Sequence, residues 1–342
     1  MALLFVDGFD HYGNLDITKK WSSIAGSPSI EAGNGRRGTG ALVAMTSGTG
    51  VIRNFTAGDS WRMGCSLKVG ALPGAWASIF TLYDAGSIQS DLRVNPDGTL
   101  EVTRAWFTLT GAVSALTLSV GVTYYIEWKL TIADSIAANS CKVRVNGVDW
   151  ITVPAGQDLK ATSNTTANQL RLGSANPSGS MGGSTYIDDL YVCDASGSTN
   201  NDFLGDVRVD TLFPNADGTY SQFTCSTGTS HYALVDETAP NTTDHNESST
   251  AGHKDSYALA NLSALSSTIY GVQLNVAALK DDTGARSLKV GMRSSSTDSV
   301  DAGSALTTSQ LYYNRILETD PATTAAWTES GVNAAEALVE AL

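Results

Sequence analysis

The segment Tyr124-Tyr-Ile-Glu-Trp-Lys-Leu-Thr-Ile132 decides the class of fold, because apolar and polar residues alternate along it. Alternation with a period of two is the pattern of a β-strand that packs one face on a core. Further along, Lys142-Val-Arg-Val145 and residues 148–153 flank Asn146-Gly147, a dipeptide typical of a type I′ hairpin turn. We therefore predict consecutive antiparallel strands here.

The same alternation extends outward in both directions. Before and after the central segment it predicts strands at 3–6, 61–69, 78–83, 91–94, 99–103, 169–172 and 185–192. In the second half it predicts strands at 206–213, 268–277, 286–293 and 310–317, a turn at 214–218 and a short helix at 333–342. Turn signals at this spacing favour sandwiches or jelly rolls, so the predicted class is all-β with two β-sandwich domains.

A polar stretch marks the expected boundary between the domains. Residues 196–205 offer few apolar anchors, as is typical of a linker. We predict a jelly-roll domain over 1–195 and a second β-sandwich over 206–342.

Composition narrows the classes of partner. The 342 residues carry a net charge of −13, which repels nucleic-acid phosphates and anionic membranes. No apolar run approaches the length of a membrane span, and the first residues lack the basic start of a signal peptide. We expect no nucleic acid, no membrane insertion and no ordinary secretion.

The cysteines and histidines predict no metal site. Cysteine pairs at metal-ligand spacing are absent, and we expect buried free thiols. The histidines of the second half, in an acidic stretch, are predicted to be solvated in a loop. The cysteines are Cys65, Cys141, Cys193 and Cys225, and these histidines are His231, His245 and His253.

Several short motifs, in this order, resemble the concanavalin A-like lectin/glucanase superfamily, including its laminin-G-like members. They are Asp7-Gly-Phe-Asp10, the strand at Trp61, Asn95-Pro-Asp-Gly-Thr-Leu100, Tyr124-Tyr-Ile-Glu-Trp128, Val143-Arg-Val-Asn-Gly147 and Tyr186-Ile-Asp-Asp-Leu-Tyr-Val192. The resemblance covers the first 195 residues and implies two curved, stacked sheets.

The second half resembles the C-terminal part of tailed-bacteriophage virion proteins. The motifs are Asp206 to Tyr220, Val235-Asp-Glu237, Asp255-Ser-Tyr257, Ile269-Tyr-Gly-Val-Gln273, Glu318-Thr-Asp-Pro-Ala-Thr323, Trp327-Thr328 and Asn333-Ala-Ala-Glu336. This resemblance implies a place in a virus particle.

No catalytic residue is predicted. Glucanases of the superfamily carry paired carboxylates as E-x-D-x-x-E on one strand, whereas Glu127 stands alone between Ile126 and Trp128. We therefore expect a chain that is not an enzyme, and a glycan depolymerase is set aside.

A carbohydrate site is the alternative that the sequence leaves open. Trp76, beside Pro73-Gly74, is the best candidate for an exposed ring that stacks on a sugar. Asp188 and Asp189 are further candidates, as hydroxyl partners or as oxygen ligands for calcium, the one cofactor considered. The tryptophans in strand patterns, Trp61, Trp106 and Trp128, are expected in the core.

Together these features predict a non-enzymatic structural protein of a bacteriophage virion, such as a capsid decoration, collar, fibre or tail component, made in the bacterial cytoplasm. Its expected partners are other virion proteins and copies of itself, with a trimer expected. The alternative is a phage adhesin that binds glycans on the host surface.

Overall fold

The computed structural model describes residues 2–262 and 268–342. Strands hold 45% of the residues and helices 4%, which confirms the predicted all-β class. Contacts divide the chain into two compact units, Met1–Val209 (unit 1) and Asp210–Leu342 (unit 2). The sequence instead placed the boundary at 196–205.

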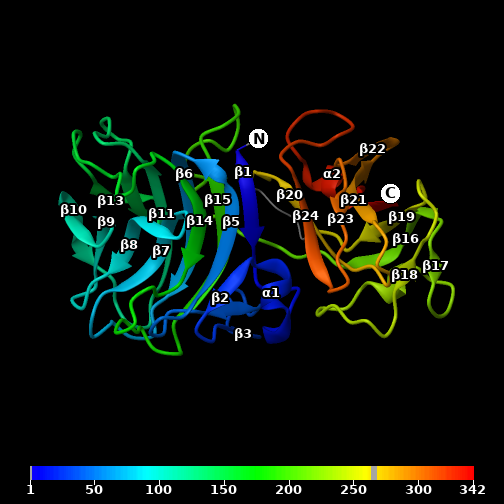
Figure 1. Ribbon diagram of the computed structural model, residues 1–342, viewed down its shortest axis with the longest axis horizontal. Coiled ribbons are helices and arrows are strands. Elements are labelled where there is room, and N and C mark those ends of the chain that lie inside the picture. The colour runs from blue at the N-terminus through cyan, green and yellow to red at the C-terminus, as the bar shows by residue number, and fades with distance from the viewer. Residues whose placement is uncertain (1, 263–267) are drawn as a thin grey trace. The chain divides into compact units, whose positions relative to one another are not determined.

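Unit 1 is built from two antiparallel sheets (Figure 1). Sheet A has the order β13-β12-β11-β6-β15-β4-β3, with β1 paired to β15. Its strands are β1 (Leu3–Asp7), β3 (Ser29–Glu31), β4 (Ala41–Val43), β6 (Ser60–Lys68), β11 (Thr123–Thr131), β12 (Lys142–Val145), β13 (Val148–Thr152) and β15 (Tyr186–Asp194).

Sheet B has the order β10-β9-β8-β7-β14-β5-β2. Its strands are β2 (Ser23–Ala25), β5 (Gly50–Gly58), β7 (Ala77–Asp84), β8 (Ser87–Val94), β9 (Thr99–Arg104), β10 (Phe107–Thr117) and β14 (Ala167–Leu172). A 3-10 turn, η1 (Asn14–Asp16), and the short helix α1 (Ile17–Lys20) follow β1 in the chain.

Alternating apolar residues of these strands form the core of unit 1. On β11 and β6 the registered pairs Trp128–Met63 and Ile126–Cys65 are fully buried. Trp61 and Trp128 are among the largest fully buried side chains, as predicted. Burial of each large apolar side chain contributes about 1.5–3 kcal/mol.

The structure confirms the predicted type I′ turn at Asn146-Gly147. Asn146 and Gly147 have φ angles of 50° and 79°. A type I′ turn requires positive φ at both central positions, which Asn and Gly adopt at low cost.

Unit 2 contains a larger sheet, sheet C, and two ribbons. Sheet C has the order β16-β19-β25-β21-β22, with β23 paired to β21, and the ribbons are β17-β18 and β20-β24. The strands are β16 (Pro214–Ser221), β17 (Thr224–Cys225), β18 (Asn246–Glu247), β19 (Lys254–Leu259), β20 (Val272–Ala278), β21 (Ser287–Ser294), β22 (Thr297–Val300), β23 (Ser304–Ala305), β24 (Leu311–Leu317) and β25 (Glu336–Ala341), and the helical turns are η2 (Tyr232–Leu234) and α2 (Glu329–Asn333).

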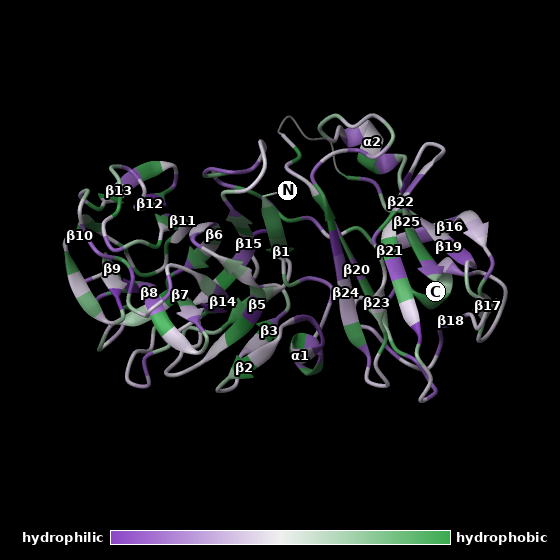
Figure 2. Ribbon diagram, turned by 45° about the horizontal axis from the view of Figure 1, so that its top comes forward, coloured by the Kyte–Doolittle hydropathy of each residue, from purple (hydrophilic) through white to green (hydrophobic). Residues whose placement is uncertain are grey.

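The ribbon β20-β24 supplies a second layer over sheet C. Leu274 of β20 packs in one buried cluster with Val290 of β21 and Val339 of β25. Hydrophilic and hydrophobic residues alternate along β21, as the bands in Figure 2 show. This alternation lets one face of the strand join the core.

Several local predictions in the second half were wrong. Residues 336–341, inside the predicted helix 333–342, form β25, which pairs with both β19 and β21. The predicted turn at 214–218 lies within β16, and 206–213 form no regular strand. Two flanking strands override the helix propensity of the Ala-, Leu- and Glu-rich tail.

Cys65, Cys141 and Cys193 are buried free thiols, as predicted, whereas Cys225 is only partly buried. His231 departs from the prediction of a solvated loop. It is buried, and its Nδ1 lies 2.7 Å from Oδ2 of the fully buried Asp255. Among the described residues, no helix has the length and apolarity needed to cross a membrane.

Candidate functional site

The face of sheet B that points away from the core carries a row of polar side chains. Across β14, β7, β8 and β9, the register aligns Arg171 with Thr81, Thr81 with Asp91, and Asp91 with Thr103. Their strand neighbours, such as Leu92, are fully buried in the core. Alternation therefore sends the polar side chains to the opposite face.

Asp91 lies at the centre of this row and is fully buried. Its Oδ1 accepts a hydrogen bond of 2.7 Å from Thr81 Oγ1, and burial raises the pKa of Asp91 to about 6. Within the described part of the chain, Oγ1 of Thr103 has no hydrogen-bond partner. Buried polar atoms are normally paired, so this spot has spare hydrogen-bonding capacity.

The next row holds a buried ion pair between Arg93 and Glu101. Nε and Nη2 of Arg93 donate to Oε2 of Glu101 at 3.0 and 2.9 Å. The other carboxylate oxygen accepts a hydrogen bond of 2.6 Å from Thr108 Oγ1. These contacts fix the guanidinium in one orientation.

Two tryptophans lie over this ion pair. The guanidinium of Arg93 is 4.9 Å from the ring centroid of Trp76, a cation–π distance. The ring of Trp76 in turn lies 4.8 Å from that of Trp106. Trp106 is 38% exposed and its neighbour Phe107 is 74% exposed. Trp76 and Trp106, with Arg93 and Glu101 beneath them, are called the aromatic platform below.

The turn that carries Trp106 is strained. Arg104 pairs with Phe107 across a two-residue turn in which Ala105 and Trp106 have φ angles of 41° and 79°. Non-glycine residues in such conformations cost about 1–3 kcal/mol each, and they cluster at functional sites. The local sequence thus gives up stability to hold the Trp106 indole in this position.

Of the three residues predicted for carbohydrate binding, only Trp76 belongs to the platform. Its carbonyl accepts a hydrogen bond of 2.7 Å from Asn176 Nδ2, which fixes the loop before β7. Sequence patterns placed Trp106 in the core, but it is exposed at a hairpin turn. The sequence pattern did not identify Arg93 and Glu101 as site residues, because they are brought together only by the register of β8 and β9.

Asp188 and Asp189 instead lie on β15 in sheet A, and both are buried. Asp189 forms an ion pair of 3.0 Å with Arg37 and accepts a hydrogen bond from Val209 N. Asp188 accepts from Arg36 N, and burial raises the pKa of Asp188 to about 7. Their contacts are made within unit 1, between segments distant in sequence.

Residues 201–209, called the strap below, cover the outer face of sheet A around Glu127. Oε1 of Glu127 accepts hydrogen bonds from Tyr191 Oη at 2.6 Å and from Gly205 N at 2.8 Å. The ring of Phe203 in the strap lies 4.9 Å from Lys129 Nζ and 4.4 Å from the Arg144 guanidinium. Glu127, the one carboxylate on the central strand, is therefore covered by the chain itself.

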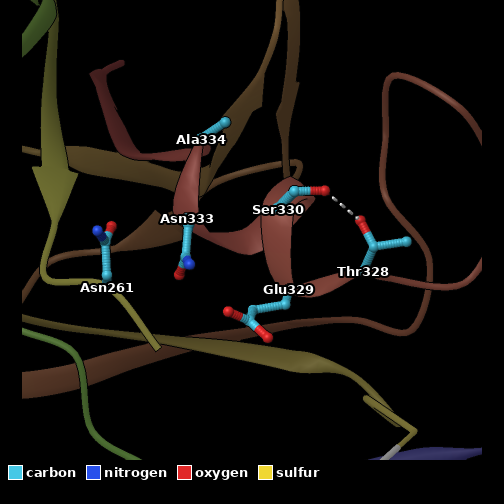
Figure 3. A pocket seen from close by; sticks show the side chains of 6 residues that line it. All are labelled: Asn261, Thr328, Glu329, Ser330, Asn333 and Ala334. Atoms are coloured by element: carbon cyan, nitrogen blue, oxygen red, sulfur yellow. Dashed lines mark hydrogen bonds between the residues drawn. The ribbon is translucent and has the colours of Figure 1, made fainter. Parts of the chain in front are cut away.

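Unit 2 has a shallow pocket at α2, lined by Asn261, Thr328, Glu329, Ser330, Asn333 and Ala334 (Figure 3). Its polar groups serve the local fold. Thr328 Oγ1 accepts from Gly331 N, and Asn333 Oδ1 accepts from Leu262 N. In the described ranges, no three His, Cys, Asp or Glu side chains gather as a metal site would require.

Comparisons with known proteins find similarity to solved structures but none to curated sequences. No family model matches the chain, and no curated protein matches it in sequence. Trypanosoma rangeli sialidase in complex with sialic acid is 11% identical with a TM-score of 0.35, over 48% of this chain and 27% of the sialidase. The chain thus spans about a quarter of the length of the sialidases it matches.

Two further solved structures are similar. Domain 4 of AbnA, a GH43 extracellular arabinanase from Geobacillus stearothermophilus, in complex with arabinotriose, is 15% identical with a TM-score of 0.34, over 56% of this chain and 93% of that domain. Alginate lyase Aly36B is 11% identical with a TM-score of 0.33, over 44% and 80%.

These comparisons contradict the prediction that the chain is not an enzyme. The sialidase, the arabinanase and the alginate lyase to which the chain is similar are enzymes. The prediction rested on a missing carboxylate motif, and that motif is specific to one kind of glucanase. The solved structures are β-sandwich proteins that act on or bind carbohydrate, and they bear no mark of a bacteriophage origin.

Proposed function

We propose that the chain is a glycan-binding protein and that the aromatic platform of sheet B is its binding surface. The observation that carries the proposal is the stack in which Trp106 rests on Trp76 and Trp76 rests on the Arg93–Glu101 ion pair. An exposed ring supported in this way is preorganised, so a ligand does not have to order it on binding.

The chemistry of the platform suits a sugar. The apolar face of a pyranose or furanose ring packs against an indole, while its hydroxyls need donors and acceptors nearby. Trp106 supplies exposed aromatic area, and the Arg93–Glu101 pair beside Trp76 supplies polar groups. The strain at Ala105 and Trp106 also supports a functional role for this turn.

The test uses the full chain on an array of neutral and acidic glycans, followed by calorimetry with the ligands it retains. Trp106→Ala should weaken binding at least about fivefold, because truncation of a central aromatic hot spot costs more than about 1 kcal/mol. Trp150→Ala is the matched control, since Trp150 lies on β13 of sheet A and contacts Tyr124. Unchanged affinity in Trp106→Ala, or no retained glycan, would contradict the proposal.

We infer as a second candidate that the chain is a structural component of a bacteriophage particle. The resemblance of residues 206–342 to virion proteins supports it. So does β10, the terminal strand of sheet B, which exposes Val113 (44%) and Leu116 (53%). An apolar edge strand favours pairing with another copy of the chain.

Two measurements test this candidate. Light scattering on the purified chain should find an oligomer that Leu116→Glu dissociates. Mass spectrometry of particles produced from the encoding genome should find the chain among their proteins. A monomer at all concentrations together with particles that lack the chain would contradict it.

A further inference from the structure

A buried cluster at the start of unit 1 belongs neither to the platform nor to the strap. Asp7 ends β1, and Lys20 ends α1. Lys20 Nζ lies 3.0 Å from Asp7 Oδ1, and both side chains are fully buried. His11 Nε2 lies 3.0 Å from the same Lys20 nitrogen. An amine, a carboxyl group and an imidazole are therefore in contact in the interior.

The surroundings of this cluster are aromatic. Lys20 Nζ is 5.3 Å from the ring centroid of Phe5 and 5.4 Å from that of Tyr12. On the far side of the carboxyl group, Oδ2 of Asp7 accepts hydrogen bonds from Tyr12 Oη at 2.8 Å and Trp21 Nε1 at 3.1 Å. Two fixed donors on one oxygen resemble an oxyanion hole.

The buried setting also brings the groups toward reactive protonation states. Burial lowers the pKa of Lys20 to about 8, so a fraction of the amine is neutral near pH 7. Burial lowers the pKa of His11 to about 3, so its imidazole is neutral near pH 7. Burial alone would raise the pKa of Asp7, but the adjacent Lys20 ammonium and the hydrogen bond from Phe9 N hold it below the usual value.

We propose that Lys20 and Asp7 join in an isopeptide bond between Nζ and Cγ. The Lys20 ammonium gives a proton to Oδ1 of Asp7, 3.0 Å away, and the freed electron pair of Nζ attacks Cγ of the resulting carboxylic acid. Tyr12 Oη and Trp21 Nε1 stabilise the negative charge on Oδ2. Oδ1, which already carries the proton from the ammonium, receives a second proton from the attacking nitrogen and leaves as water. One ammonium and one carboxylate thus become a neutral amide and a water molecule, with no change in oxidation state.

Proximity and burial both favour this reaction. Lys20 Nζ is held 3.0 Å from Oδ1 of the carboxyl group that it attacks, and well-oriented intramolecular reactions gain effective molarities on the order of 10⁵ M or more. A buried ion pair pays a large desolvation cost, and the amide removes both charges. Once formed, the bond links β1 to α1 covalently.

The intact mass of the full chain, measured after complete unfolding, tests the proposal. The chain should be lighter than its sequence by the mass of one water molecule. Trypsin should cut after Lys19 but not after Lys20, and it should release a branched peptide in which Asp7 is joined to the peptide from Lys20 to Arg36. Lys19→Arg should keep the mass deficit, whereas Lys20→Arg should restore the full mass.

One competing reaction needs a control. The dipeptide Asp7-Gly8 can also lose water by closing a cyclic imide on its own backbone. That loss would persist in Lys20→Arg and would be reversed by mild alkali, while an isopeptide bond survives alkali. If Lys20→Arg does not fold, fragmentation of the branched peptide from the unaltered chain still locates the bond. Full mass in the unaltered chain, or an equal deficit in Lys20→Arg, would overturn the proposal.

Discussion

Arg93 donates two hydrogen bonds to a single oxygen of Glu101, at 3.0 and 2.9 Å, on a face of sheet B where neither side chain is more than 9% exposed. Removal of one partner of such a pair leaves the other charge buried and unpaired. This relationship links the stability of unit 1 to the geometry of the aromatic platform, because Trp76 stacks on the same guanidinium.

Arg93→Ala should lower the free energy of unfolding of unit 1 by about 3–5 kcal/mol. Urea denaturation followed by tryptophan fluorescence can measure this, since Trp327 is the one tryptophan beyond unit 1 in the sequence. Asp134→Ala is the control, because its ion pair with Lys160 is 70% exposed on the Asp134 side and is worth at most about 1 kcal/mol. Equal losses in the two variants would refute the buried role of the pair.

Replacement of the turn Ala105-Trp106 by Asn-Gly should raise stability while it abolishes binding of any glycan ligand. Asn and Gly adopt positive φ readily, so the strain of about 1–3 kcal/mol per residue is relieved. Thermal unfolding should shift upward, and calorimetry should find no heat of binding. A lower melting temperature would show that the Trp106 indole stabilises the fold more than its backbone strain destabilises it.

Gly64→Ala should destabilise unit 1 by about 1–3 kcal/mol or more. A Cβ at this position would lie 2.5 Å from the Tyr191 ring and 3.0 Å from the Tyr125 ring, and overpacking of this kind costs about 1–3 kcal/mol or more. Gly183→Ala, where a Cβ meets nothing within 4 Å, should stay within about 0.5 kcal/mol of the unaltered chain. Similar denaturation midpoints for both variants would contradict the close packing around Gly64.

Asp188→Asn should flatten the pH dependence of stability between about pH 4 and pH 7. Burial raises the pKa of Asp188 from 3.8 to about 7 in the folded chain. Protonated Asp188 therefore favours the folded state, fully below the unfolded value of 3.8, and this contribution is lost as the pH rises through 7. Urea titrations at several pH values check the slope. An unchanged slope in Asp188→Asn would show that other groups dominate.

The sequence predicted those parts of the fold whose signals are local. The hairpin around Asn146-Gly147 was correct because alternation and turn chemistry coincide within one short segment. β25 was mistaken for helix because its Ala, Leu and Glu residues favour helix. Its strand state depends on β19 and β21, which lie far away in sequence.

In the candidate site, too, only the feature with a local sequence signal was predicted. Trp76 was identified from its Pro-Gly neighbours, since loop position is a local property. Its support by Arg93, Glu101 and Trp106 depends on strand register and on an unusual turn without glycine, and neither can be inferred from spacing alone.

The strap determines where the chain can be truncated when unit 1 is expressed separately. A piece that stops at residue 195 would strip Glu127 of its bond from Gly205 and remove Phe203 from between two cations. The truncated piece would also expose to water the outer face of sheet A that the strap covers. Such a piece would tend to aggregate. Halves intended for separate expression are therefore best separated after Val209.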